Sequence, residues 1–262
     1  MNMGYRTDIL CVSKDPGLKL PEQVSQFSRF KFLHDAAKEP LYRVDLPTDD
    51  WPFLYLIRKA VPFDYLISIG ALLVFSVAAI FGLRGRSFGA GDLHFGLMGM
   101  GFLLLETKSI SDCTLYFGAT WFVTMVVVAG VLLMVMAANL LAERVREFSL
   151  RMYVPLFIAL ALLFVVPRER ILEFAFAVRL VWALLVVPLP VFFAGFIFST
   201  TFRESAAPSA VFGANLIGAM LGGFCEYLAM AIGGHRLMML VMAAYLGSML
   251  TMLMARRRSR AI

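Results

Sequence analysis

The chain has 262 residues, 60% of which are hydrophobic, and its formal net charge is +6. The hydrophobic residues lie in long blocks without strand-like alternation, so they predict membrane helices and exclude a transmembrane barrel. The excess positive charge flanks these blocks, as topology signals do, and no aromatic residue accompanies the basic C-terminal run, so we expect no nucleic-acid partner.

Residues 1–62 differ in composition from the rest of the chain. They contain nine Lys or Arg residues, eight Asp or Glu residues and six prolines. Their few apolar residues do not predict a complete hydrophobic core. We therefore expect a polar N-terminal tail, or the remnant of a soluble domain, over 1–62.

Apolar blocks long enough to cross a bilayer begin after Pro62. They predict an all-α fold, a polytopic transmembrane helix bundle over 63–255 with about seven spans. Pro188 and Pro190 predict a kink in the fifth helix. A basic C-terminal tail over 256–262 follows the bundle. The expected helices cover 63–83, 93–111, 118–142, 152–167, 172–201, 209–233 and 236–255.

The charges of the loops predict the orientation of the bundle. With seven spans, one side of the membrane collects Arg84, Arg86, Arg144, Arg146, Arg151, Arg203 and the four arginines of the C-terminal tail. The opposite side collects Lys108, Arg168, Arg170 and Arg236 from its loops, together with the N-terminal tail. Because basic loops stay in the cytoplasm, we expect the C-terminus there.

Two of the expected helices carry small residues at helical spacing. Ala214, Gly218 and Gly222 recur every four positions, and Glu226 follows in the same register. Gly96 and Gly99 crowd the second helix. Small residues at this spacing let helices approach closely in lipid, so we expect these positions to be helix-packing surfaces. Close packing accounts for the small residues and leaves the carboxylate of Glu226 to be explained.

Polar side chains inside the apolar blocks are the candidate functional groups. They are Glu106, Lys108, Asp112, Asn139, Asn215 and Glu226. Lys108 and Asp112 are four residues apart, so a pair that reaches water at the membrane interface is one interpretation. The two asparagines are typical of hydrogen bonds between membrane helices. A sharper alternative brings Glu106, Glu226 and Asn215 into one cavity that holds a cation or a polyamine.

Cofactor and catalytic motifs are absent from the sequence. The three cysteines form no CxxC motif and no zinc-type spacing, so we expect no metal. His94 and His235 begin different helices on opposite faces, so we expect no haem held between them. No nucleophile and base occur in a recognisable pattern, so we expect no catalytic residue and no cofactor.

Four ordered motifs resemble a known family. They are TDDWPFLYL at 48–56, FLLLETKSI at 102–110, FGATW at 117–121 with ANLL at 138–141, and FGANLIG at 212–218 with EYL at 226–228. Together they resemble the C-terminal membrane region of bacterial membrane-bound spermidine-synthase-like proteins, which are polyamine aminopropyltransferase-like. In that family a catalytic Rossmann-type domain precedes the membrane helices, and this chain lacks the Gly-rich turn of such a domain.

The resemblance implies a multi-pass protein of the bacterial inner membrane without the family's enzymatic activity. We expect a non-enzymatic membrane scaffold or accessory subunit of a larger complex, with lipid and other membrane subunits as partners. One alternative is a transporter-like protein for a cation or polyamine. The other is the membrane half of a split enzyme, with a soluble aminopropyltransferase-like partner chain.

Overall fold

The computed structural model describes Thr48, Asp50, Trp51, Phe53, Leu56 and residues 58–84, 89–145 and 147–259. The chain divides into two units, 1–45 and 46–262, and every described residue belongs to the second. Most of the tail predicted over 1–62, and residues 260–262 of the basic tail, therefore lie outside the described residues.

The described part of the chain is all-helical apart from one isolated bridge between Thr48 and Trp51. The long elements are α3 (Phe63–Arg84), α4 (Ala90–Phe117), α5 (Trp121–Arg144), α6 (Tyr153–Val165), α8 (Phe176–Val181) with α9 (Leu189–Arg203), α10 (Pro208–Glu226) and α12 (Gly234–Ser259). The short ones are η2 (Leu150–Met152), α7 (Arg168–Leu172), η3 (Trp182–Val186) and α11 (Ala229–Ile232).

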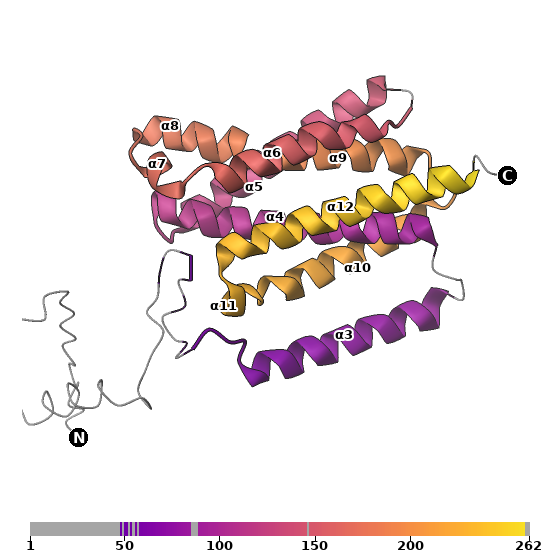
Figure 1. Ribbon diagram of the computed structural model, residues 1–262, viewed down its shortest axis with the longest axis horizontal. Coiled ribbons are helices and arrows are strands. Elements are labelled where there is room, and N and C mark those ends of the chain that lie inside the picture. Colours follow the sequence, from indigo (N-terminus) through magenta and orange to yellow (C-terminus); the bar gives the residue numbers. More distant parts are fainter. Residues whose placement is uncertain are drawn as a thin grey trace, which may run out of the picture. The chain divides into compact units, whose positions relative to one another are not determined.

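Successive long helices reverse direction across the bundle. In Figure 1, α3, α5, α9 and α12 run one way, and α4, α6 and α10 run the other way. The bundle therefore has two ends. We call the end that holds the start of α12 the charged end, defined by Asp50, Lys108, Asp112, Arg168 and Glu226. The opposite end holds the chain reversals between α5 and α6 and between α9 and α10.

Among the described residues, four helical stretches are long and apolar enough to cross a membrane. They are Trp121–Arg144, Phe176–Arg203, Pro208–Ile232 and Gly234–Ala255. These stretches indicate a membrane-embedded helical protein. The apolar parts of α3 and α6 are shorter, Phe63–Ser76 and Leu150–Val165. The 28-residue α4 is long enough but carries Glu106, Lys108 and Asp112.

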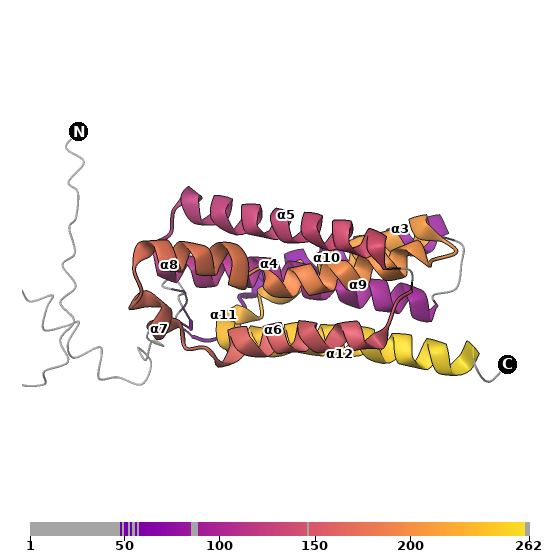
Figure 2. The ribbon, with the colours of Figure 1, turned by 90° about the horizontal axis from the view of Figure 1, so that it is seen from above.

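Helix α4 lies in the middle of the bundle. It packs against α10 and α12 and also contacts α5 and α9, and Figures 1 and 2 show it between these neighbours. The main core contains Leu104 and Leu105 of α4, Val127 of α5 and Tyr245 of α12. By contrast, α3 lies at the edge of the bundle and contacts α10, and its Tyr65 packs against Tyr227, directly after α10, with ring centres 5.2 Å apart.

Several helix boundaries differ from those expected. Helix α4 runs to Phe117, beyond the expected end at 111, because Lys108 and Asp112 pair with each other without ending the helix. The helix expected over 209–233 is confirmed as the helical stretch Pro208–Ile232, in which one turn at 227–228 separates α10 from α11. Helix α12 continues to Ser259, into the expected basic tail.

The irregularity expected from Pro188 takes the form of a π-helical turn. The N–H of Val187 donates to the carbonyl of Trp182 at 3.0 Å, a spacing of five residues. Pro188 follows directly and has no N–H with which to continue an α-helical pattern. The turn joins α8 to α9, and Gly130 of α5 packs against its Leu184 carbonyl.

Candidate functional site

The tryptophans gather at the charged end of the bundle. Trp121 begins α5 and is 77% exposed, Trp51 packs on α11, and Trp182 shares a pocket with Lys108 and Arg168. These are all three tryptophans of the chain. Because tryptophan favours the boundary between hydrocarbon and water, the charged end has the composition of a membrane interface.

The segment before α3 is attached to the charged end by Asp50 and Trp51. Trp51 is only 1% exposed, and its indole N–H donates to the carbonyl of Met230 at 2.6 Å. The carboxylate of Asp50 accepts from the N–H of His235 at 2.5 Å, in the first turn of α12. The Gly234 N–H donates to the Asp50 carbonyl at 2.8 Å. These contacts tie the start of α12 to a segment about 180 residues earlier in the chain.

Gly233 allows this close approach. Its φ of +86° is a conformation that residues with a side chain rarely adopt. A Cβ atom added here would come 2.3 Å from a carboxylate oxygen of Asp50. The position therefore requires glycine for two reasons: its positive φ, and the lack of space for a side chain beside Asp50.

Lys108, Asp112 and Arg168 form an ion-pair network beside this junction. Lys108 pairs with Asp112 one helical turn later on α4, as the four-residue spacing suggests. Arg168 of α7 lies 3.1 Å from Asp112 and 3.8 Å from Asp50. Lys108 is only 7% exposed, so its charge is compensated mainly by Asp112 and little by solvent. The network links α4, α7 and the segment before α3.

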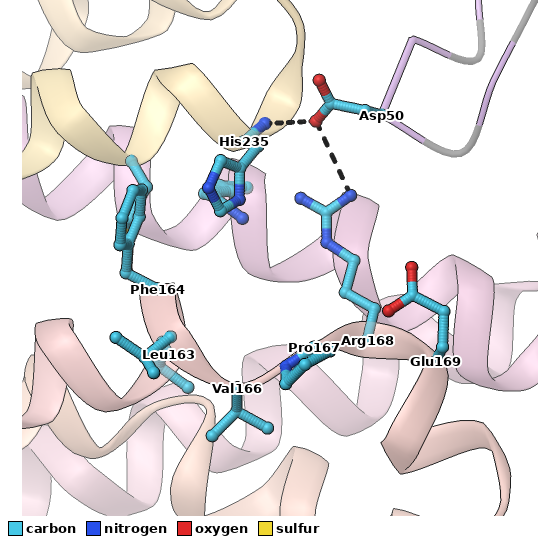
Figure 3. Close-up of a pocket in the computed structure, with 11 residues that line it drawn as sticks. Asp50, Leu163, Phe164, Val166, Pro167, Arg168, Glu169 and His235 are labelled. Carbon is cyan, nitrogen blue, oxygen red and sulfur yellow. Dashed lines mark hydrogen bonds and ion pairs between the residues drawn. The ribbon is translucent and has the colours of Figure 1, made fainter.

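A pocket of about 570 Å³ opens beside the network. Its charged wall contains Asp50, Lys108, Arg168 and Glu169, and its apolar wall contains Leu163, Phe164, Val165, Val166, Pro167 and Met238. Figure 3 shows Arg168 and Glu169 on one side of the pocket and Phe164 and His235 on the other. The His235 ring stacks on Phe164, with centres 4.4 Å apart. The pocket thus offers both charge signs beside an apolar surface.

Glu226 lies at the C-terminal end of α10 and lines a second pocket. This pocket of about 240 Å³ is also lined by Lys108, Asp112 and Phe53. Glu106 is not among its lining residues. The carboxylate of Glu226 thus lies near the Lys108–Asp112 pair at the charged end, away from the middle of α10.

The small residues of α4 and α10 face one another within the chain. A Cβ atom added to Gly218 would lie 1.7 Å from the Gly96 carbonyl oxygen, and one added to Gly99 would lie 2.0 Å from the Asn215 carbonyl oxygen. Gly222 meets the Met100 backbone in the same way, and Ala214 is buried against Gly96. These small residues therefore pack α4 against α10 inside the bundle.

The two asparagines of the apolar blocks bond to neighbouring helices. The Asn215 side-chain amide donates to the Phe95 carbonyl at 3.1 Å, which joins α10 to α4. Asn139 accepts a hydrogen bond from the Ser199 hydroxyl, which joins α5 to α9. Both also line an apolar pocket of about 230 Å³ between these helices.

A buried polar cluster surrounds His94 in the interior. The Ser248 hydroxyl lies 2.8 Å from His94 Nδ1 and 2.8 Å from the Tyr153 hydroxyl, and the Thr201 hydroxyl lies 3.3 Å from His94 Nε2. The cluster joins α4, α6, α9 and α12. His235 precedes Ser248 by 13 residues on α12, so the two histidines are roughly 20 Å apart along the bundle.

The sequence did not predict that Asp50, Trp51, Arg168 and His235 lie together in one site. They come from three distant parts of the chain and make no local pattern. The available signal was a tryptophan beside acidic residues in a segment that is otherwise polar. A tryptophan in such a segment often has a buried partner.

Comparisons with protein families, with characterised proteins and with solved structures find no match to this chain. The class that the fold defines is therefore a helical membrane-embedded protein with a charged, pocketed end. The likeness to spermidine-synthase-like membrane regions stays a prediction based on four motifs.

Proposed function

We propose that this protein is a non-enzymatic membrane scaffold or accessory subunit, which holds a protein module at the charged end of its helix bundle. The observation that best supports this proposal is the contact of Asp50 and Trp51 with α11 and α12. A buried indole and a carboxylate paired with Arg168 make this segment a fixed attachment in place of a flexible tether.

The interior of the bundle supports a static role. The contact of α4 with α10 is closed by Gly96, Gly99 and Gly218, and interiors packed this closely resist rearrangement. The paired charges of Lys108, Asp112 and Arg168 lie at one end of the bundle, and Glu226 lies at the end of its helix. Because the small-residue faces are occupied inside the chain, we propose that partners dock at the charged end.

We further propose that all seven long passes cross the bacterial inner membrane, with the C-terminus in the cytoplasm. Support comes from the alternating directions of the passes and from the position of α4 among helices that are apolar enough to span. The arginine-rich chain reversals lie at the end opposite the tryptophans. That asymmetry is typical of membrane proteins whose basic loops are cytoplasmic.

The scaffold proposal predicts that wild-type protein, tagged and purified in a gentle detergent, brings other membrane subunits with it at fixed stoichiometry. Trp51→Ala removes the buried indole and its hydrogen bond, at a cost of about 3–5 kcal/mol. We expect this variant to remain in the membrane and to lose its partners. The measurement is the protein composition of the purified sample.

Trp121→Ala is the matched control, because Trp121 lies at the same end and is largely exposed. We expect it to retain the partners. Wild-type protein that purifies alone, or a Trp51→Ala variant with an unchanged set of subunits, would contradict the proposal.

A second candidate function is cation binding at the pocket that contains Glu226. The observation that favours it is the lining of that pocket by Glu226 and Asp112, because Lys108 compensates only one of these two negative charges. On this alternative, Glu226→Gln abolishes uptake of a labelled cation or polyamine into cells that express the protein. On the scaffold proposal, uptake does not depend on Glu226.

A further inference from the structure

The pocket between α6, α7 and α12 lies where a bilayer presents its headgroups. Its apolar wall comes from the last residues of α6 and from Pro167, directly before α7. Trp121 and Trp182, at the same end, mark this level as the boundary of the hydrocarbon. A molecule in the pocket therefore contacts the apolar ends of helices on one side and charges at the membrane surface on the other.

The pocket lining carries both charge signs. Lys108 and Arg168 contribute two positive charges, and Asp50 and Glu169 contribute two negative charges; Asp112, outside the lining, also pairs with both cations. A simple anion or a simple cation would match only half of this wall. A zwitterion that carries a phosphate and an ammonium group matches both halves, because charged groups of each sign gain charge-assisted hydrogen bonds.

The volume agrees with a ligand of this kind. About 570 Å³ lies within the range of pockets that enclose small molecules, roughly 300–1,000 Å³. Phe164 and the His235 ring stacked on it form an aromatic surface beside the charged wall. Leu163, Val166 and Met238 supply apolar contacts suited to the start of an acyl chain.

We propose that this pocket binds the headgroup of a zwitterionic phospholipid with a primary amine, with its phosphate at Lys108 and Arg168 and its ammonium at Glu169. The proposal goes beyond the scaffold role and depends only on the charged end lying at a membrane interface. The glycerol and acyl chains would extend along the apolar wall provided by α6.

The test is native mass spectrometry of the full chain after purification with dioleoyl-phosphatidylethanolamine or dioleoyl-phosphatidylglycerol. We expect wild-type protein to retain about one phosphatidylethanolamine per chain and to prefer it about tenfold over phosphatidylglycerol, which lacks the ammonium. Glu169→Gln should remove that preference while leaving the retention of phosphatidylglycerol unchanged. Equal retention of the two lipids by the wild type would overturn the proposal.

Two further variants distinguish the loss of a binding charge from a general loss of folding. Arg168→Gln should lower the retention of both lipids, whereas Arg170→Gln, on the same short helix and outside the lining, should lower neither. If Arg168→Gln fails to fold, Glu169→Gln still decides the question, because Glu169 is exposed. Its matched control is Glu173→Gln, and an unchanged preference in Glu169→Gln contradicts the assignment.

A soluble headgroup distinguishes a lipid from a free phosphate ester. Glycerophosphoethanolamine has the same phosphate and ammonium without acyl chains. We expect an equal concentration of it to leave the bound phospholipid in place, because the apolar wall contributes to binding. Full displacement at equal concentration would show that the lipid is not the ligand.

Discussion

Gly218 lies where α10 comes closest to α4. A Cβ atom at this position would be 1.7 Å from the Gly96 carbonyl oxygen, a backbone atom that cannot rotate away. The two helix axes must therefore separate to admit even a methyl group. At the residue scale, the bundle depends on the absence of side chains at a few positions and on paired charges at a few others.

Gly218→Ala should destabilise the protein by about 1–3 kcal/mol, the usual range for overpacking a closely packed contact. The measurement is the midpoint of thermal unfolding in detergent, which we expect to fall. Gly213→Ala is the control on the same helix, since no heavy atom lies within 4 Å of its added Cβ. An unchanged midpoint in Gly218→Ala would contradict the contact with α4.

Helix α12 shows how a distant segment determines the start of an element. Its first N–H groups are bonded by Asp50, whose carboxylate and carbonyl accept from His235 and Gly234. Helix α12 in turn supplies Ser248 to the buried cluster around His94. At the element scale, the segment before α3 is part of the bundle, although its composition resembles that of the tail.

Asp50→Ala should free the segment before α3 from α12. We expect a loss of about 0.5–2 kcal/mol, as for other helix caps, and faster tryptic cleavage after Arg58 and Lys59, which lie in that segment. Asp64→Ala, in the exposed first turn of α3, is the control, and trypsin should cleave it at the same rate as the wild type. If the two variants are cleaved equally fast, Asp50 does not hold the segment.

The elements were largely predictable, and their contacts were less so. Long apolar blocks indicated the helices, because only a helix pairs all backbone groups within one segment in lipid. The end of α4 was predicted too early, because charged residues such as Lys108 and Asp112 often mark the end of a membrane-spanning helix. Here they pair with each other along the same helix, which continues to Phe117. The helix over 209–233 was predicted, and only the turn at 227–228 within it was not, because mostly apolar residues lie on both sides of that turn.

The candidate site was predictable only where its members are close in sequence. The spacing of Lys108 and Asp112 predicted their pairing on one helix. The approach of Arg168 to Asp112 joins residues 56 positions apart, and that of Asp50 to His235 joins residues 185 positions apart. Such contacts depend on the packing of α6, α7 and α12 against α4, which no local pattern specifies.

At the scale of the whole molecule, the bundle has two chemically different ends. The charged end carries the tryptophans, the ion-pair network and the two larger pockets lined by Lys108, and the other end carries arginine-rich chain reversals. There, Arg203 donates to the Ala142 carbonyl and so caps the last turn of α5. The scaffold and lipid-binding proposals both place the charged end at a membrane interface, and the proposed topology places the two ends on opposite sides of the membrane.

The most direct test is cysteine labelling of intact cells that express a variant in which Cys11, Cys113 and Cys225 are serine. A single cysteine replaces Ala119, between α4 and α5, or Ala206, between α9 and α10; both positions are exposed. We predict that a membrane-impermeant maleimide labels the cysteine at 119 in intact cells, and that the cysteine at 206 reacts only after permeabilisation. Labelling of both positions from the same side would contradict the account.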